Sequence, residues 1–180
     1  LKWLQDNPAK RSCGMTGAGS TPHIAALLLG RQSKLDWQAV PYQGDAPAFL
    51  ALLSGEVPIS VASVAGGLEH VKAGKLRLLG ITASERSVYV PDVPTMVQAG
   101  LDVVVEDRHA VFAPGQITPA ALAQVQQALQ QALASRAVGE LLQKMSLPKA
   151  APVADFPALL KADAERWGNL VKALNITVEG

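Results

Sequence analysis

The stretch Ser12-Cys-Gly-Met-Thr-Gly-Ala-Gly-Ser-Thr-Pro-His-Ile-Ala25 decides the fold. Its order predicts a strand, a tight glycine loop and the first turn of a helix. Ser20 and Thr21 are good N-cap residues, and Pro22 fits a first helical turn because an N–H group has no helical partner there. Glycines let backbone N–H groups approach another group closely, and the positive end of the helix dipole favours an anion. The stretch predicts either an anion site or a plain turn that joins a strand to a helix.

Nucleotide binding is not predicted for this glycine loop. A Walker A loop carries a Lys directly after its glycines, and this loop has none. The dinucleotide pattern Gly-x-Gly-x-x-Gly fails as well, because Pro22 stands at its third glycine position.

Strand-like and helix-like segments alternate from this loop onward. Apolar residues at helical spacing follow the loop, and a later helix has Asp45 as its expected cap. The alternation predicts βαβ units in a doubly wound, mostly parallel α/β sheet. The expected helices are 23–35, 46–53 and one ending near 73, and the expected strands are 37–42, 57–64 and 76–82, the last apolar almost throughout.

The pattern changes after residue 102. Residues 103–105 and 110–113 are strand-like and apolar, and the charged run 106–109 separates them. Such a run forms either a solvated bulge or one side of a cleft whose ligand needs charge. Beyond Pro114 the sequence is helical, with expected helices at 119–134, 136–145 and 155–174.

Composition excludes several classes of function. The net charge is +1, and the Lys and Arg residues are scattered, so a nucleic-acid partner is not expected. Cys13 is the single cysteine, which leaves no internal disulfide and favours a small buried hydrophobe. The three histidines lack Cys or carboxylate neighbours at metal-ligand spacing, so no metal and no cofactor are expected. The chain also lacks a Gly-x-Ser-x-Gly nucleophile elbow.

Six short segments occur in one order along almost the whole chain: 14–25, 40–44 with 47–48, 53–57, 70–77, 91–95 with 99–100, and 112–114. Together they resemble the solute-binding receptors of tripartite tricarboxylate transporters, the TctC or Bug type. The resemblance implies a clamshell of two α/β lobes, similar to type II periplasmic binding proteins. Residues 1–105 would form the second, ligand-binding lobe. Residues 106–180 would form the crossover strand and the helical C-terminal part of the first lobe, whose N-terminal portion is absent because family members are longer at that end.

The resemblance also implies a site. In the family, the loop that corresponds to Thr16, Gly17, Ala18, Gly19, Ser20 and Thr21 offers N–H groups and hydroxyls to a ligand carboxylate. His23, Tyr42 and Ser63, at or near strand ends, would complete it together with Arg108 and His109. The last two stand where the tricarboxylate branch has Trp-Arg, and Arg108 is the better cation because it is always protonated.

Two positions depart from the family pattern. Met15 replaces a common Ser. Ala62, next to Ser63, stands where many members have an Asp that suits ligands with an amine. The absence of that Asp favours a plain carboxylate over an amino acid.

The implied function is that of a non-enzymatic periplasmic receptor. It would capture a di- or tricarboxylate and deliver it to the membrane permease subunits of the transporter. In a signalling use, a sensor protein would be a further partner. The residues alone leave an alternative from another class: a small-molecule enzyme of doubly wound fold that binds a phosphate or carboxylate with the glycine loop.

Overall fold

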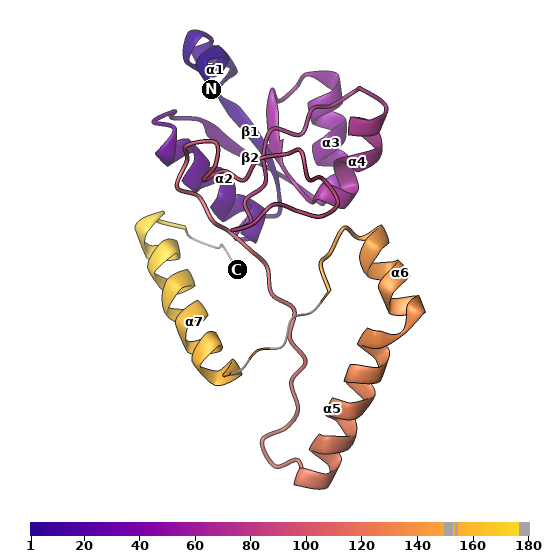
Figure 1. Ribbon diagram of the computed structural model, residues 1–180. Coiled ribbons are helices and arrows are strands. Elements are labelled where there is room, and N and C mark those ends of the chain that lie inside the picture. The colour runs from indigo at the N-terminus through magenta and orange to yellow at the C-terminus, as the bar shows by residue number, and fades with distance from the viewer. Residues whose placement is uncertain (150–152, 154, 177–180) are drawn as a thin grey trace. The chain divides into compact units, whose positions relative to one another are not determined.

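The computed structural model describes residues 1–149, 153 and 155–176 and is shown in Figure 1. The chain divides into two compact units. The first unit contains residues 1–106 together with the described residues from 155 onward, and the second unit begins at Asp107 and ends at Val153.

A three-stranded parallel sheet forms the centre of the first unit. Its strands are β1 (Ser12–Thr16), β2 (Gln38–Tyr42) and β3 (Ile59–Val61), in the order β2-β1-β3. Thr16 pairs with Tyr42 on one side of β1, and Met15 pairs with Val61 on the other side. The three strands therefore end at one edge of the sheet, and the predicted α/β fold with a parallel sheet is confirmed.

The helices that connect these strands cover both faces of the sheet. Helix α2 (Thr21–Gln32) joins β1 to β2, α3 (Asp45–Ser54) joins β2 to β3, and α4 (Val64–Lys72) follows β3. Connections between parallel strands are right-handed in almost all proteins. The β1-to-β2 and β2-to-β3 connections run in opposite directions across the sheet. They therefore place α2 on one face and α3 on the other, with α4 packed beside α3 (Figure 1).

This reversal of direction defines a topological switch point. The chain leaves β1 towards the face that α2 covers and leaves β3 towards the face that α3 and α4 cover. Ligands of open α/β sheets bind in the crevice outside the carboxyl ends of the strands at such a point. The carboxyl ends of β1 and β3 are therefore where a ligand site is expected.

The core of the first unit lies between the sheet and α2. Cys13 and Met15 of β1 are almost fully buried there, as are residues on one side of α2 and Trp37 before β2. Cys13 is thus the buried strand residue that its sequence predicts, and burial raises the pKa of its thiol to about 12. The short helices α1 (Lys2–Asp6) and η1 (Pro8–Lys10) precede β1.

The prediction of a strand at 76–82 is wrong. Its apolar residues are not all covered, since the side chain of Leu79 is 61% exposed. Only Ile81 makes a strand-like pair, an isolated bridge to Thr95, and the backbone N–H of Val105 donates to Thr82 O at 2.8 Å. The segment lies against the coil that follows it instead of extending the sheet beyond β3.

Helix α7 (Phe156–Ala173) makes contacts within the first unit. Trp167 packs against the core cluster of the α/β sheet. The Arg166 guanidinium donates to Val104 O, and Arg31 donates to Ala173 O at 3.3 Å. These contacts attach α7 to residues 1–106, although Arg166 and Val104 are 62 positions apart in the sequence.

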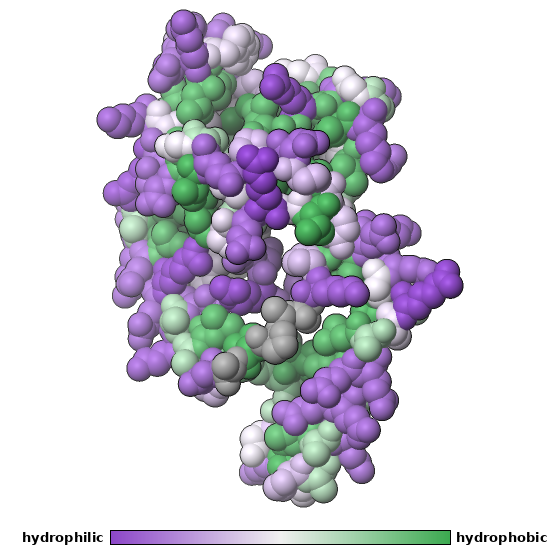
Figure 2. Space-filling view, viewed as in Figure 1, coloured by the Kyte–Doolittle hydropathy of each residue, from purple (hydrophilic) through white to green (hydrophobic). Residues whose placement is uncertain are grey.

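The second unit contains α5 (Pro119–Ala134) and α6 (Arg136–Lys144). Hydroxyls cap both helices: Thr118 Oγ1 accepts from Ala121 N, and Ser135 Oγ accepts from Val138 N, each at 3.3 Å. Helix α5 carries exposed apolar side chains at helical spacing, and Figure 2 shows apolar surface beside polar residues over this part of the chain. Among the described residues, no helix has the length and apolar character needed to cross a membrane.

Candidate ligand-binding site

The glycine loop 17–20 connects β1 to α2 at the carboxyl edge of the sheet. Gly17 and Gly19 have φ values of 69° and 73°, which L side chains rarely adopt, so this turn requires glycine at both positions. The Ser20 hydroxyl shares its one proton between Thr16 O and Gly17 O, the latter at 2.8 Å, and its oxygen accepts from His23 N at 3.3 Å. Ser20 thus closes the loop and caps α2 at the same time, as the sequence predicted for an N-cap residue.

His23 holds the loop from inside the first turn of α2. The Gly19 N–H donates to His23 Nδ1 at 3.0 Å. An imidazole nitrogen that accepts a hydrogen bond carries no proton, so the ring is neutral and its proton is on Nε2. Partial burial lowers the pKa of His23, which favours the same neutral form. The Nε2–H group is then a donor at the start of α2.

The loop offers a ligand fewer N–H groups than its glycines suggest. Gly17 N donates to Tyr42 O at 3.0 Å, Gly19 N to His23, and Ser20 N to Gly17 O at 3.4 Å. The groups that suit an incoming carboxylate are the hydroxyl of Thr16, the backbone N–H of Ala18 at the exposed tip of the loop and the Nε2–H of His23. A carboxylate there also faces the positive end of the α2 dipole.

At the end of β2, Tyr42 contributes its backbone to the edge of the sheet and its ring to the sheet surface. A ring carbon of Tyr42 lies 3.3 Å from where a side chain on Gly14 would begin. The Tyr42 hydroxyl donates to Glu56 Oε1 at 2.6 Å. That hydrogen bond, with smaller contributions from burial and the Glu56 charge, raises the pKa of Tyr42 to about 12. The hydroxyl is therefore committed to Glu56, whereas the Tyr42 carbonyl fixes the glycine loop.

At the end of β3, Ser63 caps α4. Its Oγ accepts from Gly66 N at 3.1 Å and donates to a carboxylate oxygen of Asp45. The sequence had Asp45 as the cap of its own helix, which is wrong: the N-cap of α3 is Gly44, which has no side chain to accept the bond. The carboxylate of Asp45 instead accepts from Ser63, at the start of the neighbouring helix α4. Sequence reasoning did not place Asp45 in the site.

The structure brings together the loop residues, His23, Tyr42 and Ser63 in the first unit. Arg108 and His109 belong to the second unit, where both side chains are exposed on the coil that follows Asp107. Their assignment to a ligand stays a prediction.

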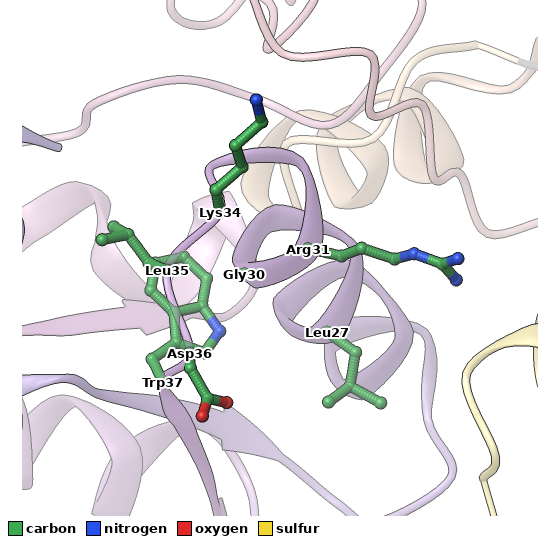
Figure 3. Close-up of a pocket in the computed structure, with 7 residues that line it drawn as sticks. All are labelled: Leu27, Gly30, Arg31, Lys34, Leu35, Asp36 and Trp37. Carbon is green, nitrogen blue, oxygen red and sulfur yellow. The ribbon is translucent and has the colours of Figure 1, made fainter.

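A separate pocket lies at the end of α2 and the turn that leads into β2 (Figure 3). Because α2 runs back along the sheet, this is the edge opposite the glycine loop. Figure 3 shows the side chains of Lys34 and Arg31 directed away from one another, so they do not converge on an anion. Trp37 Nε1 already donates to Ala26 O at 3.0 Å. Among the described residues, no group of three or more metal-ligating side chains is present.

Known proteins match almost the whole chain. Residues 1–176 match the family described as tripartite tricarboxylate transporter family receptor. A protein encoded in the tcbD-tcbE intergenic region of Pseudomonas sp. strain P51 is 30% identical over 176 residues, which are 95% of this chain and 52% of that protein. The chain thus spans about half the length of the curated relatives that it matches.

Solved structures share the fold. Rhodopseudomonas palustris Rpa4515 with adipate has a TM-score of 0.79 at 22% identity, over 98% of this chain and 60% of that one. MatC (Rpa3494) from the same species, with bound malate, has a TM-score of 0.71 at 27% identity, over 94% and 60% of the two chains. The periplasmic binding protein BugD has a TM-score of 0.76 at 22% identity, over 99% and 61%.

Proposed function

Because the chain belongs to the tripartite tricarboxylate transporter receptor family, we propose that it is part of a periplasmic receptor that captures a small carboxylate. The related structures that hold malate and adipate support a dicarboxylate ligand, and the family description supports a tricarboxylate as well. Membership of a receptor family argues against the alternative that the sequence had left open, a small-molecule enzyme. The permease subunits of a tripartite transporter are the partners that the family name supports, with a sensor protein as a further partner in a signalling use.

The observation that carries this proposal is the capped glycine loop at the switch point of the sheet. Ser20 and His23 hold the loop in one conformation, so its donors need no rearrangement when an anion arrives. The first turn of α2 adds the positive end of a helix dipole. A carboxylate of the ligand is therefore expected at residues 16–21, with the Nε2–H of His23 as one of its donors.

The remaining groups extend the proposal. Arg108 and His109 would supply positive charge from the second unit to a further carboxylate. Residues 1–105 would then be the ligand-binding lobe, and residues 106–180 would form the crossover and helices of the other lobe. Helix α7 lies within the second range but contacts residues 1–106, so it would be the part of that lobe that packs on the ligand-binding lobe.

Calorimetric titration with malate, citrate and adipate tests the proposal. We expect micromolar or weaker binding of at least one of them, and a ligand at a hundred times its dissociation constant should add about 2.7 kcal/mol to the free energy of unfolding. Ser20→Ala removes the hydroxyl that closes the loop. The loss of one such hydrogen bond, about 1 kcal/mol, should weaken binding about fivefold.

Ser54→Ala is the matched control, since Ser54 Oγ donates to Ala51 O within its own helix α3. It should leave the affinity unchanged. Carboxylate binding that is equally strong in the Ser20 variant would contradict the site, and no binding of any carboxylate to the wild-type chain would contradict the function.

A further inference from the structure

Asp45 places a negative charge at the switch point of the sheet. It is the first residue of α3, which follows β2, yet its carboxylate accepts a hydrogen bond from Ser63, which precedes α4 and follows β3. Strand β1 lies between β2 and β3. The Asp45–Ser63 pair therefore crosses the sheet at the carboxyl end of β1, where the glycine loop begins.

The backbone fixes this pair next to the loop. Gly17 N and Gly44 N donate to the same carbonyl oxygen, that of Tyr42, at 3.0 and 2.9 Å. Gly44 directly precedes Asp45, so the first residue of the loop and the residue before Asp45 share one acceptor. On the other side, a side chain on Gly66 would come within 2.8 Å of the Asp45 carboxylate, so the carboxylate lies against the first turn of α4.

This arrangement changes what Ser63 can offer a ligand. A hydroxyl has one proton, and that of Ser63 is donated to Asp45, while its oxygen accepts from Gly66 N. On this side of the crevice a ligand therefore meets a carboxylate instead of a hydroxyl donor. A second ligand carboxylate near Asp45 would be repelled, whereas an ammonium or hydroxyl group would be attracted.

On the basis of the proposed function, we propose that Asp45 is a specificity-determining residue. It selects ligands that carry a hydrogen-bond donor next to the bound carboxylate, and it favours an ammonium group over a hydroxyl group as that donor. The absence of an Asp at Ala62 favoured a plain carboxylate. Asp45 supplies an equivalent charge from the neighbouring helix and reverses that preference.

Titration of the 180-residue chain with L-aspartate and succinate tests this selection. The two dicarboxylates share one carbon skeleton, and only L-aspartate carries an ammonium group. The wild-type chain should bind L-aspartate at least tenfold more tightly than succinate, with L-malate between them. Asp45→Asn keeps the shape and the hydrogen bond to Ser63 but removes the charge, so the preference should fall below threefold.

Glu69→Gln is the matched control. It removes the same charge from an exposed position further along α4, where Glu69 pairs with Lys72 at 2.8 Å. The preference should survive in this variant. An unchanged ratio in Asp45→Asn, or a wild-type chain that prefers succinate, overturns the role of Asp45 and leaves the proposed function standing.

Failure of the wild-type chain to bind malate, L-aspartate or succinate overturns both proposals. The wild-type ratio is measured without any variant, so the selection remains testable if Asp45→Asn does not fold. Thermal unfolding of each variant shows whether a lost preference accompanies a lost fold.

Discussion

Gly30→Ala should destabilise the first unit, although it replaces glycine inside a helix. Gly30 lies in the last turn of α2, and the added Cβ would lie 2.6 Å from Trp37 Nε1 and 3.0 Å from two carbons of that ring. The Trp37 side chain cannot withdraw freely, because it is 9% exposed and its Nε1–H donates to Ala26 O at 3.0 Å.

The magnitude follows from three contributions. Replacing glycine by alanine in a helix stabilises by about 1 kcal/mol. Overpacking of a core costs about 1–3 kcal/mol. If the indole ring moves enough to break its buried hydrogen bond, about 1–3 kcal/mol more is lost. With all three contributions, we therefore expect the free energy of unfolding to fall by about 1–5 kcal/mol.

Urea unfolding followed by tryptophan fluorescence measures this change. Gly168→Ala is the matched control, since Gly168 also lies inside a helix of the first unit, α7, and an added Cβ there meets nothing within 4 Å. The control should gain up to about 1 kcal/mol. A Gly30 variant as stable as its control, with an unchanged denaturant slope, would refute the packing argument.

Three further predictions concern single side chains. Cys13 is buried and the pKa of its thiol is raised to about 12, so a thiol reagent at pH 8 should label it only as fast as the protein unfolds, and rapid labelling of the folded chain would contradict its burial. The pKa of His23 is lowered on folding, so the unfolded chain binds more protons near pH 6; thermal stability should fall as the pH drops below about 6.5, and His23→Asn, which keeps an acceptor for Gly19 N, should lose this dependence. Arg166→Leu removes the hydrogen bond to Val104 O and should increase hydrogen exchange throughout α7, with little change in the sheet.

The glycine loop could be predicted because its signals are local. Positive φ at Gly17 and Gly19, the N-cap at Ser20 and Pro22 in the first turn all depend on residues within one turn of each other. The alternation of strands and helices likewise predicted the parallel sheet, since each βαβ unit is encoded in a continuous segment.

The pairing across the carboxyl edge could not be predicted in the same way. Asp45 and Ser63 are 18 residues apart and meet only because α3 crosses over β1 and α4 packs beside it. Either residue alone has an ordinary interpretation as a helix cap. The apolar run 76–82 failed for a related reason: an apolar composition permits a strand, but a ladder needs a neighbouring strand in register, and Ile81 finds only Thr95.

The charges at the carboxyl edge of the sheet explain why the N-terminus of α2 is better suited to an anion than the N-termini of α3 and α4. Three helices begin there, and each presents N–H groups and the positive end of a dipole. Asp45 lies in the first turn of α3 and against the first turn of α4, so one carboxylate of the protein offsets both. Helix α2 has no acidic residue in its first turn, and the hydroxyl of Ser20 caps it without adding charge. Under the proposed function, a ligand carboxylate would therefore be drawn to α2 and repelled from the side of α4. Asp45 would then account for two properties: where the first carboxylate of the ligand binds, and why a hydrogen-bond donor is preferred next to that carboxylate.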